Sequence, residues 1–199
     1  ATPTVINEME EFLNTDTLNI YLGGTERTNL FISVESKDNF QINYEEPTII
    51  YVQTRKECEN LYKSITEEGK KCLKYHGGLN EDEKRAAHNA FIMGEIITII
   101  ATISFGMGID KSNIRHVINY GIPTDIETYY QEIGRAGRDG LQSSATLYYD
   151  NSDFNFANYI INTTKDQIQQ NRKKNALSIL RKYLNEHEMC RHKMIEYYF

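Results

Sequence analysis

The sequence predicts an α/β protein built on a parallel sheet that is flanked by helices and followed by a helical C-terminal segment. From Thr48 onward, short apolar segments alternate with longer amphipathic ones. The apolar segments show no polar alternation, which is typical of strands that are covered on both faces. Residues that cap helices stand between them, as expected where each strand returns to a parallel neighbour through a right-handed crossover.

The N-terminal elements precede this alternating region. Residues 5–13 have the apolar spacing of a short amphipathic helix that Thr4 caps. Residues 18–22 and 30–34 alternate between apolar and polar side chains, so each segment predicts a strand with one buried face. Thr48–Val52 then predicts the first strand that is buried on both faces.

Capping residues and glycines delimit the elements that follow. Capping boxes at Thr54 and at Asn80 begin two helices, which end at Gly69 and Gly94. Further strands are predicted at residues 72–75, 96–102, 116–120 and 145–149, and further helices at 126–138, 154–160 and 168–184.

The composition excludes several classes of protein. The chain has 199 residues and a net charge of −6, which argues against a protein that coats DNA by electrostatics alone. Its longest apolar stretch, Ile96–Ile103, is less than half of the ~20 residues that span a bilayer, and no signal peptide opens the chain. A membrane or secretory protein is therefore not expected. Three cysteines without a CxxC pair predict an intracellular, reducing compartment.

Two familiar nucleotide-binding motifs are incomplete or missing. Gly106 and Gly108 begin a dinucleotide-binding pattern, but Lys111 stands where the third glycine is needed. No GxxxxGK[ST] occurs in the sequence. The chain therefore has no phosphate-binding loop of its own to cradle a triphosphate.

Ligands of parallel sheets bind at the carboxyl ends of the strands, so the loops expected there are candidate sites. Thr54, Arg55 and Lys56 begin a helix, where free N–H groups and the helix dipole favour a phosphate. His76 and Gly77 follow the next strand and suit close approach of a nucleic-acid backbone, with a capping or surface role for His76 as the alternative. Such contacts hold a strand without reading its sequence and weaken with salt.

The most specific feature is the segment QEIGRAGRDG at residues 131–140. In a helix, Gln131, Arg135 and Arg138 would share one face. Two glycines inside a helix cost about 1 kcal/mol each relative to alanine, which is reasonable where the backbone approaches another group closely. Two guanidiniums on one face suit a polyphosphate, and pairing with surface acids such as Asp125 is the alternative.

Five segments resemble, in order, the motifs of a known family. YYQEIGRAGRDG at 129–140 resembles motif VI of the RecQ family of DNA helicases, and ATISFGMGIDK at 101–111 resembles its motif V. YVQTRKECE at 51–59 is similar to motif IV, and YHGGL at 75–79 to the segment that follows it. ATPT at 1–4 is similar to the end of motif III. By this resemblance the chain is identified as a member of the RecQ group of helicase superfamily 2.

The resemblance implies a fold and an activity. The chain would be the second RecA-like lobe of an ATP-dependent 3′-to-5′ DNA helicase, with ATP and Mg²⁺ bound mainly by a first lobe that the sequence lacks. It would be inactive alone, and its partners would be that first lobe and single-stranded or forked DNA. A superfamily 2 RNA helicase lobe, or a non-catalytic nucleic-acid-binding module, is the alternative.

The same resemblance assigns roles to individual residues. The residues expected to serve ATP are Arg135 and Arg138 as arginine fingers, Gln131 as a sensor of the γ-phosphate, and Gly108 and Asp110 at the sugar. Thr102 would touch the DNA backbone. Residues 24–30 read GTERTNL where the family has SFDRPNL, a stretch whose role there is an inter-lobe salt bridge.

The resemblance also divides the chain into parts. Residues 1–25 would be the end of motif III and an inter-lobe linker, and residues 26–151 the helicase C-terminal lobe. Residues 152–199 would be the helical start of a zinc-binding subdomain. The basic residues at 172–174 and 181–182 are either a DNA-facing stripe or a solvated helix face.

Cys190 would be the first of four cysteine ligands of that subdomain. The other three would lie beyond Phe199, so Zn²⁺ is expected only in a longer protein. A makeshift site of Cys190 with His187 and His192 is the alternative, although its spacing matches no familiar geometry. Cys58 and Cys72 lie on apolar stripes and are predicted to be core residues.

Overall fold

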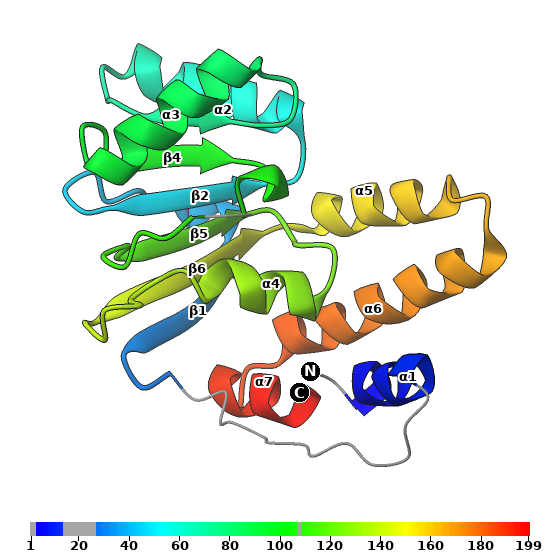
Figure 1. Ribbon diagram of the computed structural model, residues 1–199. Coiled ribbons are helices and arrows are strands. Elements are labelled where there is room, and N and C mark those ends of the chain that lie inside the picture. The colour runs from blue at the N-terminus through cyan, green and yellow to red at the C-terminus, as the bar shows by residue number, and fades with distance from the viewer. Residues whose placement is uncertain (1–2, 14–26, 107–108) are drawn as a thin grey trace.

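The computed structural model describes residues 3–13, 27–106 and 109–199, and its centre is a parallel sheet (Figure 1). Six strands lie in the order β1-β6-β5-β2-β4-β3, and all of their pairings are parallel. The strands are β1 (Leu30–Ser36), β2 (Thr48–Val52), β3 (Leu73–Tyr75), β4 (Thr98–Ala101), β5 (His116–Tyr120) and β6 (Ser143–Tyr149). The predicted fold class is confirmed, and the expected strand at 18–22 lies outside the described residues.

Helices connect and flank these strands. They are α1 (Pro3–Leu13), α2 (Arg55–Glu67), α3 (Glu81–Met93), α4 (Ile126–Ile133), α5 (Asn151–Asn162), α6 (Gln167–Asn185) and α7 (Arg191–Tyr198), with short 3₁₀ helices η1 (Lys37–Asn39) and η2 (Ile103–Gly106). No helix in the described part of the chain combines the length and the apolar character that crossing a membrane requires.

The first two crossover helices begin where the sequence places their caps. Thr54 Oγ1 accepts the N–H of Glu57 at 3.1 Å, and the Glu57 carboxylate accepts the N–H of Thr54 at 3.0 Å. Asn80 and Glu83 form the same reciprocal pair at 2.8 and 2.9 Å. Both predicted capping boxes are confirmed, and each fixes the chain direction just after the carboxyl end of a strand.

Strand β2 lies inside the sheet and is covered on both faces, as predicted. All five of its residues are buried. Ile49 and Tyr51 pack in the core shared with α3, α4 and α6, whereas Ile50 packs in the core under α2. Because successive side chains of a strand point to opposite faces, this one strand contributes to both cores. Cys58 and Cys72 lie in the second core, in agreement with their prediction.

Two boundaries differ from the predicted ones. Strand β4 begins at Thr98 rather than at Ile96, because the N–H of Ile96 donates to the carbonyl of Ala90 at the end of α3. Helix α1 begins at Pro3, so Thr4 lies within its first turn and does not cap it.

Helix α4 is shorter than predicted, which corrects the expected arrangement of the arginines. It ends at Ile133 rather than at Arg138, and Gly134 is its C-cap. Gly137 adopts a φ of +58° and donates its N–H to Ile114 at 2.9 Å, outside any helical pattern. The two glycines therefore end the helix instead of interrupting it, and Arg135 and Arg138 do not share a helical face with Gln131.

The C-terminal helices extend away from the sheet and then return to it. Helices α5 and α6 form a long hairpin beyond the carboxyl ends of the strands, and α7 lies beside β1 (Figure 1). The ring of Tyr183 on α6 packs against that of Tyr129 on α4, with centroids 5.6 Å apart. His192 bonds to the carbonyl of Leu30 at 2.8 Å through Nε2.

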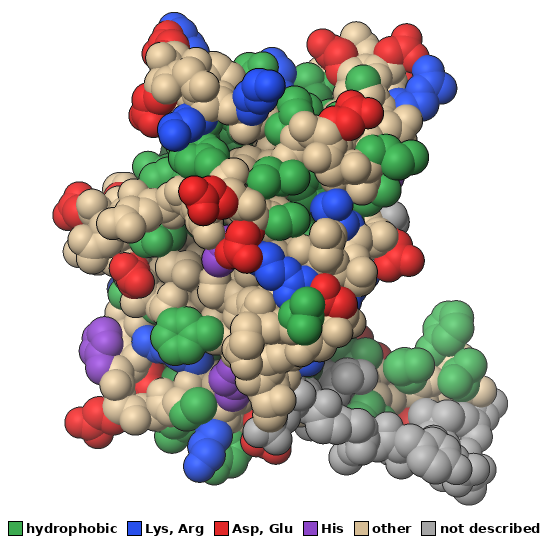
Figure 2. Space-filling view, turned by 90° about the vertical axis from the view of Figure 1, so that its left-hand side faces the viewer, with side chains coloured by type: hydrophobic (Ala, Val, Ile, Leu, Met, Phe, Trp, Pro, Cys, Tyr) green, Lys and Arg blue, Asp and Glu red, His purple; other side chains and the backbone are tan. Residues whose placement is uncertain are grey.

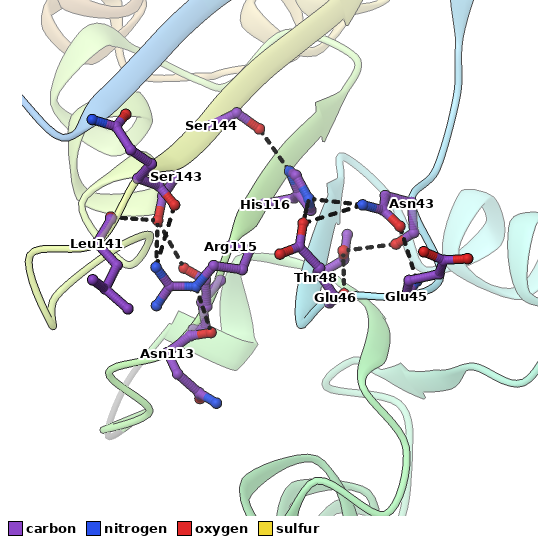
Figure 3. A network of polar contacts seen from close by, with 12 residues as sticks. Asn43, Glu45, Glu46, Thr48, Asn113, Arg115, His116, Leu141, Ser143 and Ser144 are labelled. Carbon is purple, nitrogen blue, oxygen red and sulfur yellow. Dashed lines mark hydrogen bonds and ion pairs between the residues drawn. The ribbon is translucent and has the colours of Figure 1, made fainter.

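Polar contacts tie the strands together at their amino ends (Figure 3). His116 at the start of β5 contacts Glu46 at 2.9 Å and Ser144 of β6 at 2.7 Å. Arg115 forms an ion pair with Asp139. On the molecular face that these ends form, acidic, basic and apolar side chains are interspersed (Figure 2). The glycine-rich loops lie at the opposite end of the strands.

Candidate functional site

Arg135 extends from the turn after α4 to the turn that follows β4. A Cβ atom added at Gly106 would lie 3.0 Å from Nη2 of Arg135, so the guanidinium packs directly against the bare Cα. The Nε atom of Arg135 and the hydroxyl of Tyr51 are both buried, and neither has a hydrogen-bond partner within normal geometry among the described residues. Burial raises the pKa of Tyr51, and the nearby charge of Arg135 opposes that rise.

Arg138 contacts residues 109–110, which follow η2 in the chain. Its Nη1 donates to the carbonyl of Ile109 at 3.1 Å and lies 3.8 Å from the Asp110 carboxylate. Asp110 is 97 % exposed, so this ion pair is loose and open to solvent. The structure thus brings the residues predicted to serve a nucleotide to one place, except that Gln131 is exposed on α4 and Gly108 lies outside the described residues.

Two side chains near the start of β1 clamp the turn that carries the arginines. Arg27 donates to the carbonyls of Ala136 and Gly137 at 2.7 and 2.8 Å, and Asn29 donates to Gly137 at 2.9 Å. Arg27 lies in the segment expected to make an inter-lobe salt bridge, and here it serves its own lobe. The backbone beneath Arg135 is therefore held from a segment more than a hundred residues away.

The loops after β2 and β3 are in contact, as their predicted shared role requires. Arg55 begins α2 and lies over the two glycines after β3. Cβ atoms added at Gly77 and Gly78 would each come within 3.3 Å of its side chain. Arg55 and Lys56 are exposed, so two cations stand at the N-terminus of a helix whose dipole favours an anion.

His76 occupies a different position from the one its predicted contact with a nucleic acid suggests. It is 5 % exposed, its Nδ1 accepts the N–H of Gly78 at 3.1 Å, and its Nε2 lies 2.9 Å from Glu59. Since Nδ1 accepts, Nε2 carries the proton and donates to Glu59. Both ring nitrogens are therefore engaged within the chain, and His76 shapes the loop that presents Gly77.

Thr102 follows β4 and is largely buried. Its N–H donates to the carbonyl of Tyr75, which extends the pairing of β4 with β3, and its hydroxyl bonds to Ser104 at 2.8 Å. The predicted contact of Thr102 with a DNA backbone stays a prediction.

A pocket opens at the carboxyl ends of β2 and β5, where the sequence predicts candidate sites. It has a volume of about 560 Å³ and lies between these strand ends and the α5–α6 hairpin. Thr54 and Gly121 line its sheet side, and Phe156 and Lys173 line its helical side. Its helical wall comes from a segment far along the chain, which no local pattern could indicate.

The inner wall of this pocket holds a buried pair of polar side chains, Asn119 and Glu132. Asn119 Nδ2 donates to Glu132 at 2.6 Å, and both side chains are more than nine-tenths buried. Burial raises the pKa of Glu132 to about 7, against the opposing effects of Asn119 and Arg135. The sequence held one signal for this residue, because Tyr129 at helical spacing before it marks the buried face of α4.

The described residues do not form a metal site by themselves. No three His, Cys, Asp or Glu side chains among residues 3–13, 27–106 and 109–199 lie close enough to hold an ion. Cys190 is exposed and stands alone, and His192 is bound to Leu30. One thiolate does not hold structural Zn²⁺, so the makeshift site of Cys190 with histidines is not formed here.

Comparison with known proteins places the chain among helicases. Residues 32–140 match the family described as "Helicase conserved C-terminal domain". The chain is 36 % identical to the ATP-dependent DNA helicase RecQ of Bacillus subtilis (strain 168), with all of this chain and 35 % of that protein covered. It is 35 % identical to the bifunctional 3′-5′ exonuclease/ATP-dependent helicase WRN of Mus musculus, of which it covers 15 %. The chain thus spans about a third or less of these relatives.

Solved structures share the fold. The chain resembles S. cerevisiae Dbp5 bound to RNA and ADP BeF3 with a TM-score of 0.64 and 22 % identity, over 93 % of this chain and 54 % of that one. It resembles the C-terminal domain of the DEAD-box protein Dbp5 with a TM-score of 0.54 and 24 % identity, over 78 % of this chain and 98 % of that one. The fold is therefore that of a RecA-like helicase lobe. The family match shows that the chain belongs to the helicase conserved C-terminal domain family, and its match to a RecQ helicase over the whole of this chain makes it RecQ-like.

Proposed function

We propose that this chain is the second motor lobe of an ATP-dependent DNA helicase that moves 3′ to 5′. It supplies Arg135 and Arg138 to ATP bound on a first lobe and grips single-stranded DNA at its strand-end loops. The RecQ and WRN relatives, which are described as ATP-dependent helicases, support this activity.

The observation that carries the proposal is the state of Arg135. Arg27 clamps the backbone of the next residue, Ala136. The Nε atom of Arg135 is buried without a partner among the described residues, and its guanidinium rests against Gly106. A permanently charged donor group held in this way is ready to bind an anion such as a terminal phosphate. Arg138 is less constrained, because its pairing with Asp110 is long and exposed.

Arg135 and Arg138 would act by stabilising negative charge at the γ-phosphate and by holding it in position. ATP with Mg²⁺ would supply the phosphoryl group and partial neutralisation of its charge. A guanidinium at the γ-phosphate stabilises the charge that spreads over its oxygens in the transition state, an effect worth roughly 10³–10⁵ in rate. This chain has no phosphate-binding loop. Arg135 therefore acts only when another lobe presents the nucleotide.

DNA binding is assigned to the loops after β2 and β3. Arg55 and Lys56 place two charges at the N-terminus of α2, and Gly77 lies beside them without a side chain to obstruct a phosphate. These groups contact the backbone and carry no base-reading geometry, so binding is expected to be independent of sequence.

The test is steady-state ATPase activity of the full-length protein that carries this chain. Arg135→Ala should lower kcat by about 10³-fold or more while single-stranded DNA binding is retained. Arg85→Ala is the matched control, since Arg85 is 72 % exposed on α3 and pairs with its own helix neighbour Asp82. Turnover that survives in Arg135→Ala would show that the finger assignment is wrong.

Two further measurements separate the alternatives. Stimulation of the ATPase by RNA but not by single-stranded DNA would identify an RNA helicase instead. A full-length protein that binds DNA but never hydrolyses ATP would be a non-catalytic binding module. The isolated chain should show no Mg²⁺-dependent hydrolysis, and measurable hydrolysis by a pure sample would contradict the proposed division of labour.

A further inference from the structure

We propose that Gly106 is a positioning residue whose missing side chain forms the seat of the Arg135 guanidinium. The inference rests on the proposed function, since the seat matters only if Arg135 acts on a nucleotide. A Cβ atom at residue 106 would lie 3.0 Å from Nη2 of Arg135, which is closer than such atoms normally approach, and 3.9 Å from its Cζ, which is ordinary contact. A single methyl group would therefore push the end of the guanidinium away by a few tenths of an ångström.

The backbone just before Gly106 is held in place. The preceding residue, Phe105, is 2 % exposed, and its ring centroid lies 4.6 Å from that of Tyr75 and 5.9 Å from that of Phe91. The N–H of Phe105 also donates to the carbonyl of Thr102 at 3.0 Å. The turn η2 is thus anchored in the core immediately before Gly106.

The backbone of Arg135 is fixed as well. Its N–H donates to the carbonyl of Glu132 at 3.2 Å, and the following Ala136 is fully buried. Arg27 holds the carbonyl of Ala136 at 2.7 Å. With the backbone held before Gly106 and on both sides of Arg135, displacement of the far end of the arginine side chain is the easiest way to accommodate a methyl group at residue 106.

The shape of the turn at Gly106 helps to hold the guanidinium in its seat. Nε of Arg135 has no partner among the described residues, and neither does the buried hydroxyl of Tyr51, whose pKa Arg135 influences. A misplacement of about 1 Å can cost roughly 10²-fold in rate, so a shift of a few tenths of an ångström by a methyl group at residue 106 is expected to weaken the finger by a smaller factor.

The experiment measures kcat, KM for ATP, affinity for single-stranded DNA and Tm in the full-length protein. The variants are Gly106→Ala, Arg135→Ala and Gly94→Ala. Gly94 ends α3 with a φ of +76° and has nothing within 4 Å of an added Cβ, so its alanine variant strains the fold without touching Arg135. It controls for a general loss of stability.

The expected result is a selective loss of turnover. Gly106→Ala lowers kcat by about 3- to 10-fold and leaves KM and DNA affinity within about twofold. Gly94→Ala lowers Tm and leaves kcat unchanged. If Gly106→Ala keeps the wild-type kcat while Arg135→Ala is inactive, the seat is disproved and the finger stands. If Arg135→Ala itself stays active, the proposed function fails, and the inference fails with it.

A double-mutant comparison tests whether the methyl group acts through Arg135. Lysine has no Nη2 atom, so adding Gly106→Ala to Arg135→Lys should lower kcat by less than about twofold further. An undiminished loss in the lysine background would show that the methyl group acts elsewhere and would overturn the inference.

Discussion

Glu132 lies on the inner wall of the pocket, where it accepts a hydrogen bond from Asn119 and is 7 % exposed. Removal from water disfavours its charged form, which raises its pKa from 4.5 to about 7. In the unfolded chain the same carboxyl ionises near its ordinary value. The folded state therefore holds a proton that the unfolded state has released between about pH 4.5 and 7.

This difference predicts that Glu132 makes the protein less stable as pH rises. The stabilising contribution is complete below pH 4.5 and is lost as pH rises through about 7, with a total on the order of 3 kcal/mol. Glu132→Gln keeps an oxygen for Asn119 but has no proton to release. Urea unfolding at pH 5 and pH 8 should show the wild type losing stability relative to this variant. An equal difference at both pH values would contradict the prediction.

The three cysteines differ in their exposure to solvent. Burial raises the pKa of Cys58 and of Cys72 to about 11, and both side chains lie in the core under α2. Cys190 is exposed at the start of α7. A thiol reagent at pH 8 should therefore modify Cys190 alone in the native chain and all three thiols in denaturant. Rapid labelling of Cys58 or Cys72 without denaturant would show that this core opens.

Among the elements, the turn between α4 and β6 contains two glycines with positive φ, Gly137 and Gly140, whose surroundings differ. Gly137 has a φ of +58°, and an added Cβ would lie 2.6 Å from both Asn29 Nδ2 and Ser143 Oγ. Gly140 has a φ of +82° and nothing within 4 Å of an added Cβ. Gly137→Ala should cost about 2–4 kcal/mol of unfolding free energy, because strain and overpacking both act. Gly140→Ala should cost about 1–2 kcal/mol, from strain alone.

Chemical denaturation of the two variants checks this difference. Equal costs would mean that the packing around Gly137 relaxes freely, and the clamp by Asn29 would then not hold the turn.

The same turn shows why part of the site could not be predicted. Strands β2 and β5 follow from runs of apolar and β-branched residues, which act locally. The end of α4 depends on the acceptor that Gly137 finds at Ile114 and on Arg27, more than a hundred residues earlier in the chain. Local spacing alone therefore predicts a helix that continues to Arg138, whereas α4 ends at Ile133.

The candidate site likewise has a part that the sequence predicts and a part that it does not. The motif around Arg135 identified it as a candidate anion-binding residue, because the residue types themselves carry that chemistry. Its seat on Gly106 and the pocket beside Glu132 arise from contacts between distant segments, which spacing along the chain does not record.

At the scale of the whole molecule, the charge distribution predicts the salt dependence of the proposed DNA binding. The net charge is −6, but Arg55 and Lys56 stand exposed at one helix N-terminus. Each phosphate contact that is lost should reduce the slope of log K against log salt by about 0.7 for a single strand. The double variant Arg55→Ala/Lys56→Ala of the full-length protein should therefore lose about 1.4 from that slope, as measured by fluorescence anisotropy with a labelled oligonucleotide.

Lys63→Ala is the control for this measurement, since Lys63 is 76 % exposed further along α2 and pairs with Glu67. An unchanged slope in the double variant, or an equal decrease in Lys63→Ala, would place the DNA elsewhere.

The pairing of β1 with β6 has a consequence for how the chain is made. Ser33 and Thr146 bond across this pair, although 113 positions separate them. During synthesis from the N-terminus, β1 emerges long before β6, its partner among the described strands, exists. The edge of β1 stays unpaired while the four strands β2 to β5 are synthesised. Pairing of β1 with β6 closes a loop of more than a hundred residues, which makes this step slow. The lobe therefore becomes complete in one late step, and a nascent chain that stalls before Tyr149 leaves β1 open to pairing with another chain.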